Sequence, residues 1–181
     1  MNVADLLILN GSPGSGKSTL TRAISDRLRA AKIPNATIDA DEIDLVFPSE
    51  EKSFEEFMKW KKSFMWRNLA AIWPNYVAVE ENMKIIIPMV IDSSENLAAL
   101  SAATPGGNII LCELVAPLDV MKQRVTERDG GNMEKMFWLM DRYDQGRVGN
   151  AGKYAHFEVS THGKSIDEAA LEVIKKAGWQ L

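Results

Sequence analysis

The chain has 181 residues, enough to bury the core of one domain, and we expect a single domain over residues 1–181. Its formal net charge of −4 argues against a nucleic-acid-binding surface or an anionic membrane surface. No apolar run is long enough to cross a bilayer and the N-terminus lacks a signal-peptide pattern, so we expect a cytoplasmic protein. Cys112, the only cysteine, lies in an apolar run that favours burial over a chemical role.

The first predicted strand, residues 3–9, leads directly into a glycine-rich loop. Residues 11–18 spell Gly-x-x-x-x-Gly-Lys-Ser, the spacing of a phosphate-binding loop. The glycines allow backbone conformations that a Cβ would forbid, so successive N–H groups can converge on phosphate oxygens. Apolar residues at helical spacing then predict a helix over residues 17–31, whose N-terminus points at the same phosphates. The chain is therefore predicted to bind a nucleoside triphosphate.

Single residues of this loop have separate expected roles. Lys17 places a positive charge against the β- and γ-phosphates, and Ser18 offers its hydroxyl to Mg²⁺. The Asn-Lys-x-Asp motif that selects guanine does not occur in the sequence, which argues against a signalling GTPase. The residues expected to contact the nucleotide here are Gly11, Ser12, Pro13, Gly14, Ser15, Gly16, Lys17, Ser18 and Thr19.

The rest of the chain alternates between predicted strands and helices. Further strands are expected at residues 36–39, 84–91, 108–115 and 156–160. Helices are expected at residues 49–74, 76–83, 93–102, 117–128, 133–145 and 165–177, with a break at Pro74 and a glycine-rich loop at residues 146–153. This alternation predicts a parallel three-layer α/β domain with right-handed crossovers.

An acidic cluster, Asp-Ala-Asp-Glu-Ile-Asp at residues 39–44, follows the second predicted strand. In open parallel sheets ligands bind beyond the carboxyl ends of the strands, so we expect this cluster to face the triphosphate. The alternative is a local role, with Asp41 as a helix N-cap and Asp44 as a first-turn acid that interacts favourably with the helix dipole. Whether Asp39 has a functional or a local role stays open.

With these motifs the chain resembles the P-loop small-molecule kinases of the nucleoside-monophosphate-kinase-like group. That group includes adenylate, shikimate, gluconate and adenylylsulfate kinases and chloramphenicol phosphotransferase. The resemblance rests on residues 11–18, on residues 39–44, and on Ala-Pro-Leu-Asp-Val-x-x-x-Arg-x-x-x-Arg at residues 116–128. It implies an α/β P-loop NTPase fold with a five-stranded parallel sheet in the order 2-3-1-4-5. It also implies a small helical lid at residues 124–153 and a helical acceptor-side region at residues 49–83.

The resemblance implies catalytic roles for three residues, Lys17, Asp41 and Arg128. In members of the group that phosphorylate a hydroxyl, an aspartate after strand two contacts the acceptor and can take its proton, and Asp41 matches that position. Many relatives also carry an acid at the end of strand three. This chain has Pro88 there, and Asp92 is the nearest acid.

Two arginines match the lid arginines of the group, which lie near adenine or clamp the transferring phosphoryl group. They are Arg124 and Arg128, which share one helix face at i, i+4 spacing. The alternative is a solvated basic face paired with Glu127 or Asp129. The resemblance further implies that backbone around Gly163 contacts the adenine.

The segment at residues 49–83 is rich in aromatic residues, and two interpretations are open. It can form a stacking pocket for a flat or sugar-like acceptor, or it can be the packed side of a helical subdomain. Aromatic residues at helical spacing are usually core, so we expect Phe57 and Phe64 to be buried. Trp60 and Trp66 fit either interpretation, and Arg67 can meet an anionic acceptor or face solvent.

These features together predict an ATP- and Mg²⁺-dependent phosphotransferase, a kinase that transfers the γ-phosphate to a small hydroxyl-bearing acceptor. One alternative is a nucleoside or nucleotide kinase. Another, of a different class, is a nucleotide-binding regulator with weak ATPase activity. The expected partner is a small-molecule acceptor, with neither nucleic acid nor membrane, and the expected state is a monomer or a small homo-oligomer.

Overall fold

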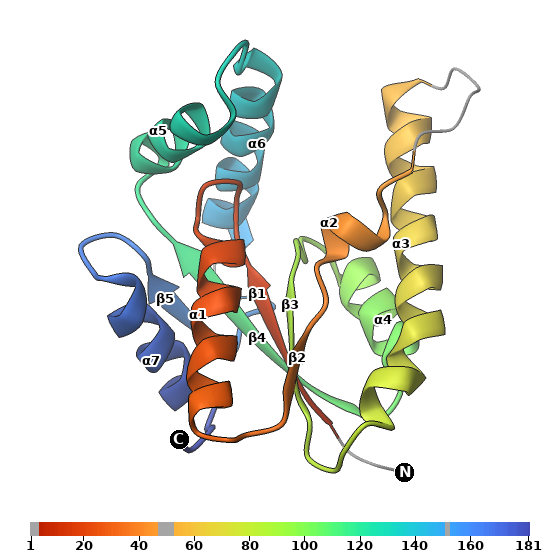
Figure 1. Ribbon diagram of the computed structural model, residues 1–181. Coiled ribbons are helices and arrows are strands. Elements are labelled where there is room, and N and C mark those ends of the chain that lie inside the picture. Colours follow the sequence, from red (N-terminus) through yellow and green to blue (C-terminus); the bar gives the residue numbers. More distant parts are fainter. Residues whose placement is uncertain (1–3, 47–52, 151–152) are drawn as a thin grey trace.

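The computed structural model describes residues 4–46, 53–150 and 153–181 as a five-stranded sheet with helices on both faces (Figure 1). The strands are β1 (Ala4–Asn10), β2 (Asn35–Thr37), β3 (Lys84–Pro88), β4 (Gly107–Val115) and β5 (Phe157–Ser160). The helices are α1 (Lys17–Ala30), α2 (Ala40–Ile43), α3 (Phe54–Val77), α4 (Ser94–Ala103), α5 (Leu118–Asp129), α6 (Glu134–Asn150) and α7 (Ile166–Lys176). All strand pairings are parallel and the order is β2-β3-β1-β4-β5, so the predicted fold class and strand order are confirmed. No helix in these ranges is long and apolar enough to cross a membrane.

β1 lies at the centre of the sheet, between β3 and β4, and this position explains its apolar sequence. Leu6 and Ile8 belong to the core on the side of α3 and α4, whereas Leu7 and Leu9 belong to the core on the side of α1 and α7. Cys112 of β4 is buried in this second core, where desolvation raises the pKa of its thiol to about 12, so its predicted burial is confirmed. The glycine-rich loop follows β1 and therefore begins at the centre of the carboxyl edge of the sheet.

The long helix α3 continues through Pro74, so the predicted break there and the predicted second helix at residues 76–83 are wrong. A capping box formed by Ser53 and Glu56 begins the helix. Trp73 fixes its last turns, because its ring is 1% exposed and its Nε1 donates a hydrogen bond to the carbonyl oxygen of Pro105 at 3.1 Å. The N–H of Ala78 still reaches the Pro74 carbonyl oxygen at 3.1 Å, so tertiary packing holds a helical path that local sequence rules disfavour.

The buried face of α3 differs from the predicted one. Met65, Leu69 and Trp73 are the residues of this helix in the core. Phe57 and Phe64 are only partly buried and lie outside the core clusters, so the prediction that they are core residues is wrong. They stack instead on the two sides of Trp60, with ring centroids 6.3 Å and 5.4 Å from its own. Their helical spacing therefore marks an aromatic ridge that is displaced around the helix, by one residue position, from the packed stripe.

Two other predicted boundaries differ from the structure. β3 ends at Pro88 rather than at residue 91, which places the proline at the end of the strand, where a missing N–H is tolerated. Helix α6 extends to Asn150, so most of the predicted loop at residues 146–153 is helical and the remainder includes residues outside the described ranges. Glycine weakens a helix by only about 1 kcal/mol, which does not forbid this extension.

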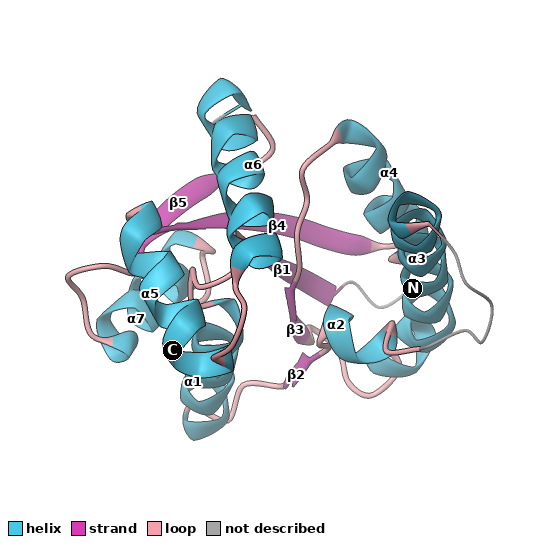
Figure 2. Ribbon diagram, turned by 90° about the horizontal axis from the view of Figure 1, so that it is seen from above, coloured by secondary structure: helices cyan, strands magenta, loops and turns pink. Residues whose placement is uncertain are grey.

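Helices α5 and α6 form a pair above the sheet that corresponds to the predicted lid region (Figures 1 and 2). Met121, Val125 and Met140 make a small core of their own between the two helices. Lys122 and Asp141 add an ion pair across the same contact at 2.6 Å. The pair is thus held together by contacts separate from the two main cores of the sheet.

Candidate active site

The glycine-rich loop wraps tightly between the sheet and helix α5. Gly14 has a φ of +79°, and a Cβ placed there would lie 2.4 Å from the carbonyl oxygen of Met121. Gly11 has a φ of +149°, and its Cβ would lie 2.8 Å from the carbonyl oxygen of Leu114. Both positions therefore require glycine for backbone conformation and for space. The loop leads directly into α1, whose first N–H groups and positive dipole end face the same region.

Lys17 lies folded over this loop. Its Nζ donates hydrogen bonds to the carbonyl oxygens of Gly11 at 2.7 Å and of Ser12 at 3.2 Å. Desolvation lowers the pKa of Lys17 to about 8, and the negative charges of Asp41 and Glu113 oppose this shift. The ammonium group is therefore a poorly solvated cation that is stabilised by the charges of Asp41 on α2 and Glu113 on β4.

The residues of the loop fit a magnesium-bound triphosphate. Ser18 and Thr19 are exposed at the first turn of α1, and the Ser18 hydroxyl is the one expected to hold Mg²⁺. The buried hydroxyls of Ser12 and Ser15 have no hydrogen-bond partner among the described residues, so both remain able to hydrogen-bond a ligand. No group of three or more His, Cys, Asp or Glu residues in the described ranges could hold a metal ion.

The acidic cluster after β2 separates into three environments. Asp39 is the N-cap of α2, because its side chain accepts a hydrogen bond from the N–H of Asp41 at 3.1 Å. Asp44 lies at the C-terminal end of α2, is 6% exposed, and pairs with Lys61 at 3.1 Å, while burial raises its pKa. The predicted local alternative, with Asp41 as cap and Asp44 as first-turn acid, is therefore wrong. Asp41 is exposed and makes none of the hydrogen bonds of a cap.

Glu113 is an acid at the phosphate loop that the sequence analysis did not identify. It lies on β4 directly opposite Asn10 of β1, is 5% exposed, and accepts a hydrogen bond from Asn10 Nδ2 at 2.6 Å. Tyr143 of α6 donates a hydrogen bond to its other carboxylate oxygen at 3.1 Å, and burial beside Glu113 raises the Tyr143 pKa. Asn10 also exchanges two hydrogen bonds with the backbone of Ile91. The sequence signal that could have identified Glu113 is a single glutamate within an apolar strand, because a buried carboxylate needs hydrogen-bond partners.

The two candidate lid arginines occupy different settings. Arg124 Nη1 donates to the Gly14 carbonyl oxygen and to Thr161 Oγ1, both at 3.1 Å, and its Nη2 donates to the Thr161 carbonyl oxygen at 2.9 Å. Thr161 in turn donates to the Ser15 carbonyl oxygen at 2.9 Å, so this network ties the phosphate loop to the segment after β5. Gly163 lies in that segment with a φ of +74° and open space around it.

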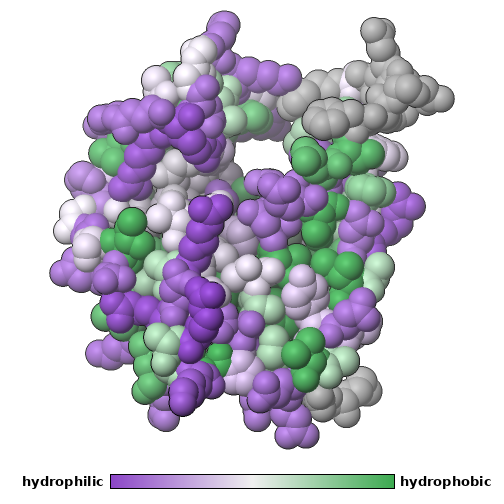
Figure 3. All heavy atoms as spheres, in the orientation of Figure 1, coloured by the Kyte–Doolittle hydropathy of each residue, from purple (hydrophilic) through white to green (hydrophobic). Residues whose placement is uncertain are grey.

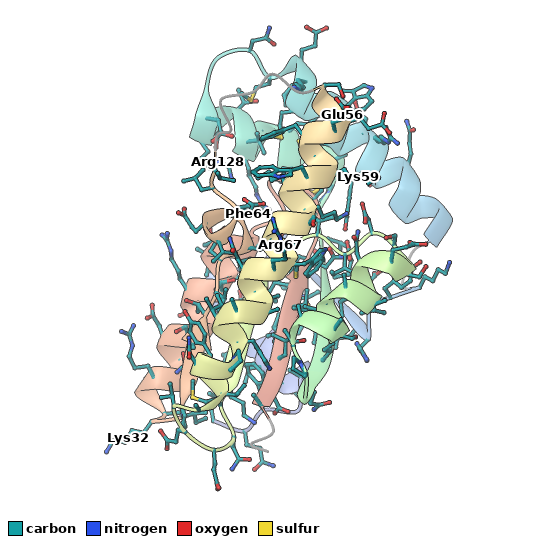
Figure 4. The ribbon with its side chains drawn as sticks, turned by 90° about the vertical axis from the view of Figure 1, so that its right-hand side faces the viewer. Lys32, Glu56, Lys59, Phe64, Arg67 and Arg128 are labelled. Atoms are coloured by element: carbon teal, nitrogen blue, oxygen red, sulfur yellow. The ribbon has the colours of Figure 1, made fainter. Side chains whose placement is uncertain are left out.

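Arg128 is exposed on α5 and forms a two-pronged ion pair with Asp129, at 2.6 Å and 2.7 Å. These hydrogen bonds raise its pKa, and the charge of Asp41 acts in the same direction. Figure 4 shows this side chain leaving the lid on the side where α2 lies. The arginine is thus within electrostatic reach of the α2 acid and held by a neighbour that it could exchange for a phosphoryl group.

A cavity of about 880 Å³ opens beside the loop, between α3 on one side and α6 on the other, and Figure 3 shows the hollow between these two parts. A volume of this size suits a small organic ligand. The cavity floor includes Asn10, Pro13 and Glu113, next to Lys17 and the phosphate loop, and its rim includes Asp41. Its other lining residues are Ala40, Asp44, Glu55, Met58, Lys59, Lys61, Lys62, Met65, Met89, Val90, Ile91, Asp92, Trp138, Leu139, Arg142, Tyr143, Gly146, Lys153, Tyr154 and Ala155.

The aromatic ridge of α3 and Arg67 lie away from this cavity. None of Phe57, Trp60, Phe64 or Arg67 lines it, and Arg67 packs over the Phe64 ring at 5.7 Å from the centroid. Figure 4 shows Phe64 and Arg67 on the outward face of α3 and Lys59 projecting toward α6. Asp92, the acid nearest to β3, does line the cavity and pairs with Lys62 at 3.7 Å.

Comparison with solved structures shows the P-loop kinase fold. A tunicamycin resistance protein from Deinococcus radiodurans superposes with a TM-score of 0.68 at 18% identity, covering 98% of this chain and 98% of that one. A gluconokinase from Sinorhizobium meliloti 1021 superposes with a TM-score of 0.62 at 20% identity, covering 98% of this chain and 94% of that one.

Sequence comparison adds a more specific relationship. An L-seryl-tRNA(Sec) kinase from Methanococcus maripaludis is 27% identical over 125 residues, which are 68% of this chain and 46% of that protein. The chain therefore spans about half the length of this relative. The family model of chloramphenicol phosphotransferase-like proteins matches residues 4–178. The predicted resemblance to P-loop small-molecule kinases is thereby confirmed, and the chain belongs to the chloramphenicol phosphotransferase-like protein family.

Proposed function

We propose that the protein is an ATP- and Mg²⁺-dependent phosphotransferase that phosphorylates a hydroxyl group of a small molecule held in the cavity between α3 and α6. One observation carries this proposal. The cavity is lined by Pro13 of the phosphate loop, by Asn10 directly before the loop, and by Asp41, so a ligand there would border the place where phosphates bind. Family membership and the two-sided arrangement of loop and cavity both support it.

On the donor side, the chain's own groups supply binding and charge. When bound, MgATP supplies the transferable phosphoryl group together with a cation that partly neutralises its charge. The backbone N–H groups of the loop and of the first turn of α1 bind phosphate oxygens, and Ser18 holds the cation. Lys17 would leave the Gly11 and Ser12 carbonyl oxygens to bind the β- and γ-phosphates.

On the acceptor side, Asp41 is the proposed base. Its carboxylate would orient the acceptor hydroxyl and take its proton as the acceptor oxygen bonds to the γ-phosphorus, while the bond from that phosphorus to the β,γ-bridging oxygen breaks and ADP leaves. Arg128 is the proposed lid cation, which would exchange Asp129 for the transferring group when the lid closes and water is excluded. Arg124 acts from the other side by holding the Gly14 carbonyl oxygen, and so positions the loop.

An acceptor screen tests the proposal. Purified protein, ATP and Mg²⁺ would be incubated with nucleosides, sugars, sugar acids, and phenicol and aminoglycoside antibiotics, and products would be followed by ADP release and by mass. We expect one chemical class to accelerate ADP release and to gain one phosphoryl group on a hydroxyl. If no acceptor accelerates ADP release above the rate with water alone, the proposal is contradicted and a nucleotide-binding regulator is favoured.

A further inference from the structure

Five basic side chains line the cavity between α3 and α6, and they divide into two sets. Lys61 pairs with Asp44 at 3.1 Å and Lys62 pairs with Asp92 at 3.7 Å, so the charges of both are balanced. The other three are Lys59 of α3, Arg142 of α6 and Lys153 of the segment before β5. We call these three side chains the cationic triad.

No carboxylate among the described residues forms an ion pair with a member of the cationic triad. Glu55 lies one turn before Lys59 and also lines the cavity, yet the two form no ion pair. Arg142 lies over the Trp138 ring at 5.4 Å from its centroid, and Lys153 lies over the Tyr154 ring at 5.4 Å. Both rings line the cavity too, so cation–π contacts hold these cations at its wall. Glu95, which does not line the cavity, interacts electrostatically with Lys153 but forms no ion pair with it.

Five acids line the cavity as well, and among them Glu55 is the one that lies beside a member of the triad, Lys59, without forming an ion pair with it. Asp44 and Asp92 are paired with Lys61 and Lys62, and Glu113 accepts hydrogen bonds from Asn10 and Tyr143. Asp41 lies on the phosphate-loop side, where it acts on the charge of Lys17. Three cations from three separate elements thus converge on one cavity beyond the proposed base, and such convergence favours a negatively charged ligand group.

We infer that the acceptor of this phosphotransferase carries an anionic oxyacid group, a carboxylate or a phosphate, which binds the cationic triad while its hydroxyl meets Asp41. The inference rests on the proposed function, because it takes the cavity ligand to be the acceptor. Arginine and lysine bind both kinds of oxyacid, and the planar guanidinium of Arg142 can hold two oxygens at once. Apolar groups such as Met58 and Met65 would cover the body of the ligand.

Matched ligand pairs test the inference by binding alone. The probes are glycerate and gluconate, which carry a carboxylate, and glycerol 3-phosphate, each against a neutral counterpart, glyceramide, gluconamide or glycerol. Calorimetry without ATP should show at least one acid binding about tenfold more tightly than its neutral counterpart. The carboxylate and phosphate arms tell the two kinds of oxyacid apart. If every acid binds no better than its neutral counterpart, the inference is overturned.

Single substitutions on α3 and α6 test which side chains give the acid its tighter binding. Lys59→Met and Arg142→Met should each weaken the preferred acid about tenfold and leave its neutral counterpart unchanged, and Lys59→Arg should keep most of the affinity. Arg67→Met is the matched control, because Arg67 lies on the same helix outside the cavity lining. Equal weakening of acid and neutral ligand by Lys59→Met or Arg142→Met would overturn the subsite, since these variants would then act on packing or on the transferring phosphoryl group.

Phosphoryl transfer to the same probes separates this inference from the proposed function. If a neutral probe is phosphorylated with a higher kcat/KM than its acid, the enzyme is a phosphotransferase but the anionic subsite is wrong. If the acids bind selectively and lose that selectivity in Lys59→Met, yet no probe is phosphorylated, the anion site stands and its role as acceptor site fails. Selective binding together with phosphorylation of the acid supports both.

Discussion

The two sides of the proposed active site, a donor side and an acceptor side, are built in different ways. The donor side is one continuous stretch, residues 11–18, whose working atoms are mostly backbone N–H groups and one lysine. The acceptor side is assembled from side chains of α2, α3, α6 and the segment before β5. A backbone site follows from the glycine spacing and survives wide sequence change, whereas a side-chain site can be rebuilt residue by residue.

The donor side is also the more firmly fixed of the two. Arg124 and Thr161 tie down the carbonyl oxygens of Gly14 and Ser15, and Asn10, Glu113 and Tyr143 form a buried network behind the loop. On the proposed acceptor side, Lys59, Arg142 and Lys153 are exposed, and Arg142 and Lys153 are held by cation–π contacts with single aromatic rings rather than by a buried hydrogen-bond network. We therefore expect substitutions on the donor side to affect catalysis strongly, and those in the helical acceptor region to change specificity or stability more than chemistry.

The largest effect is expected from Lys17→Met. Removing the cation that binds the β- and γ-phosphates should lower kcat/KM about 10³-fold, or about 4 kcal/mol of transition-state stabilisation. Lys176→Met is the control, because Lys176 is an exposed lysine of α7 far along the chain from the loop. Steady-state kinetics with the identified acceptor gives the comparison. A Lys17→Met enzyme within tenfold of the wild type would show that the loop does not bind the donor as described.

Asp41→Asn should lower kcat about 10²-fold to 10³-fold, because a positioned base contributes about that much to proton transfer. Asp39→Asn is the matched control, since asparagine is as good an N-cap as aspartate and the hydrogen bond from the Asp41 N–H is kept. Binding of ATP should be unchanged in both variants by calorimetry. Equal kcat values for the two variants would show that Asp41 is not the base that takes the acceptor proton.

The affinity for ATP should fall as the pH rises above about 8. Burial lowers the pKa of Lys17 to about 8, so the free protein loses this proton near that pH and ATP binding must then take it up again. Each further pH unit should weaken binding by up to tenfold, until the pKa of the complex is reached. The negative charge of Glu113 raises the Lys17 pKa, so Glu113→Gln should move the decline to lower pH. Titration calorimetry across pH 6.5 to 9.5 measures the affinity for ATP. An affinity profile that Glu113→Gln leaves unchanged would show that the charge of Glu113 does not act on the pKa of Lys17.

The smallest effect is expected from Pro74→Ala in α3. Alanine restores the helical N–H and removes the ring clash within a helix that already continues past this residue, at some cost in unfolded-chain entropy. We expect a gain of about 1 to 2 kcal/mol in the free energy of unfolding, which is a rise in Tm of about 2 to 8 °C. Asn75→Ala is the control at the next exposed position. A fall in Tm for Pro74→Ala would mean that the proline ring packs favourably.

The donor side and the acceptor side also differ in how well the sequence predicts them. The strand, loop and helix at residues 3–31 were predictable, because apolar runs and glycine spacing are local signals. The strand order 2-3-1-4-5 came from the family resemblance and is confirmed. The break at Pro74 was wrong because burial of Trp73 overrides a local rule, and that burial depends on Pro105, distant in sequence.

Most of the features of the site that sequence reasoning missed depend on partners that are distant in sequence. Glu113 matters because the β1–β4 register places it opposite Asn10, and because α6 brings Tyr143 to it. The cap of α2 is Asp39 rather than Asp41, which is a two-residue distinction that a cluster of acids cannot reveal. Lys59 lines the cavity and Arg67 does not, since the packed stripe of α3 lies at Met65 and Leu69 rather than along the aromatic ridge.

The central claim is that phosphates bound at the loop are passed to a ligand in the adjoining cavity. Partition of the γ-phosphate of labelled ATP between acceptor and water, in the wild type and in Met58→Trp, tests it most directly. Met58 lines the cavity but is 44% exposed, so a larger side chain there should fill the cavity without unfolding the helix, and Val79→Trp is the exposed control outside it. We predict that Met58→Trp lowers labelling of the acceptor at least about tenfold while ATP binding and hydrolysis by water stay unchanged. Undiminished labelling of the acceptor by Met58→Trp would contradict the account.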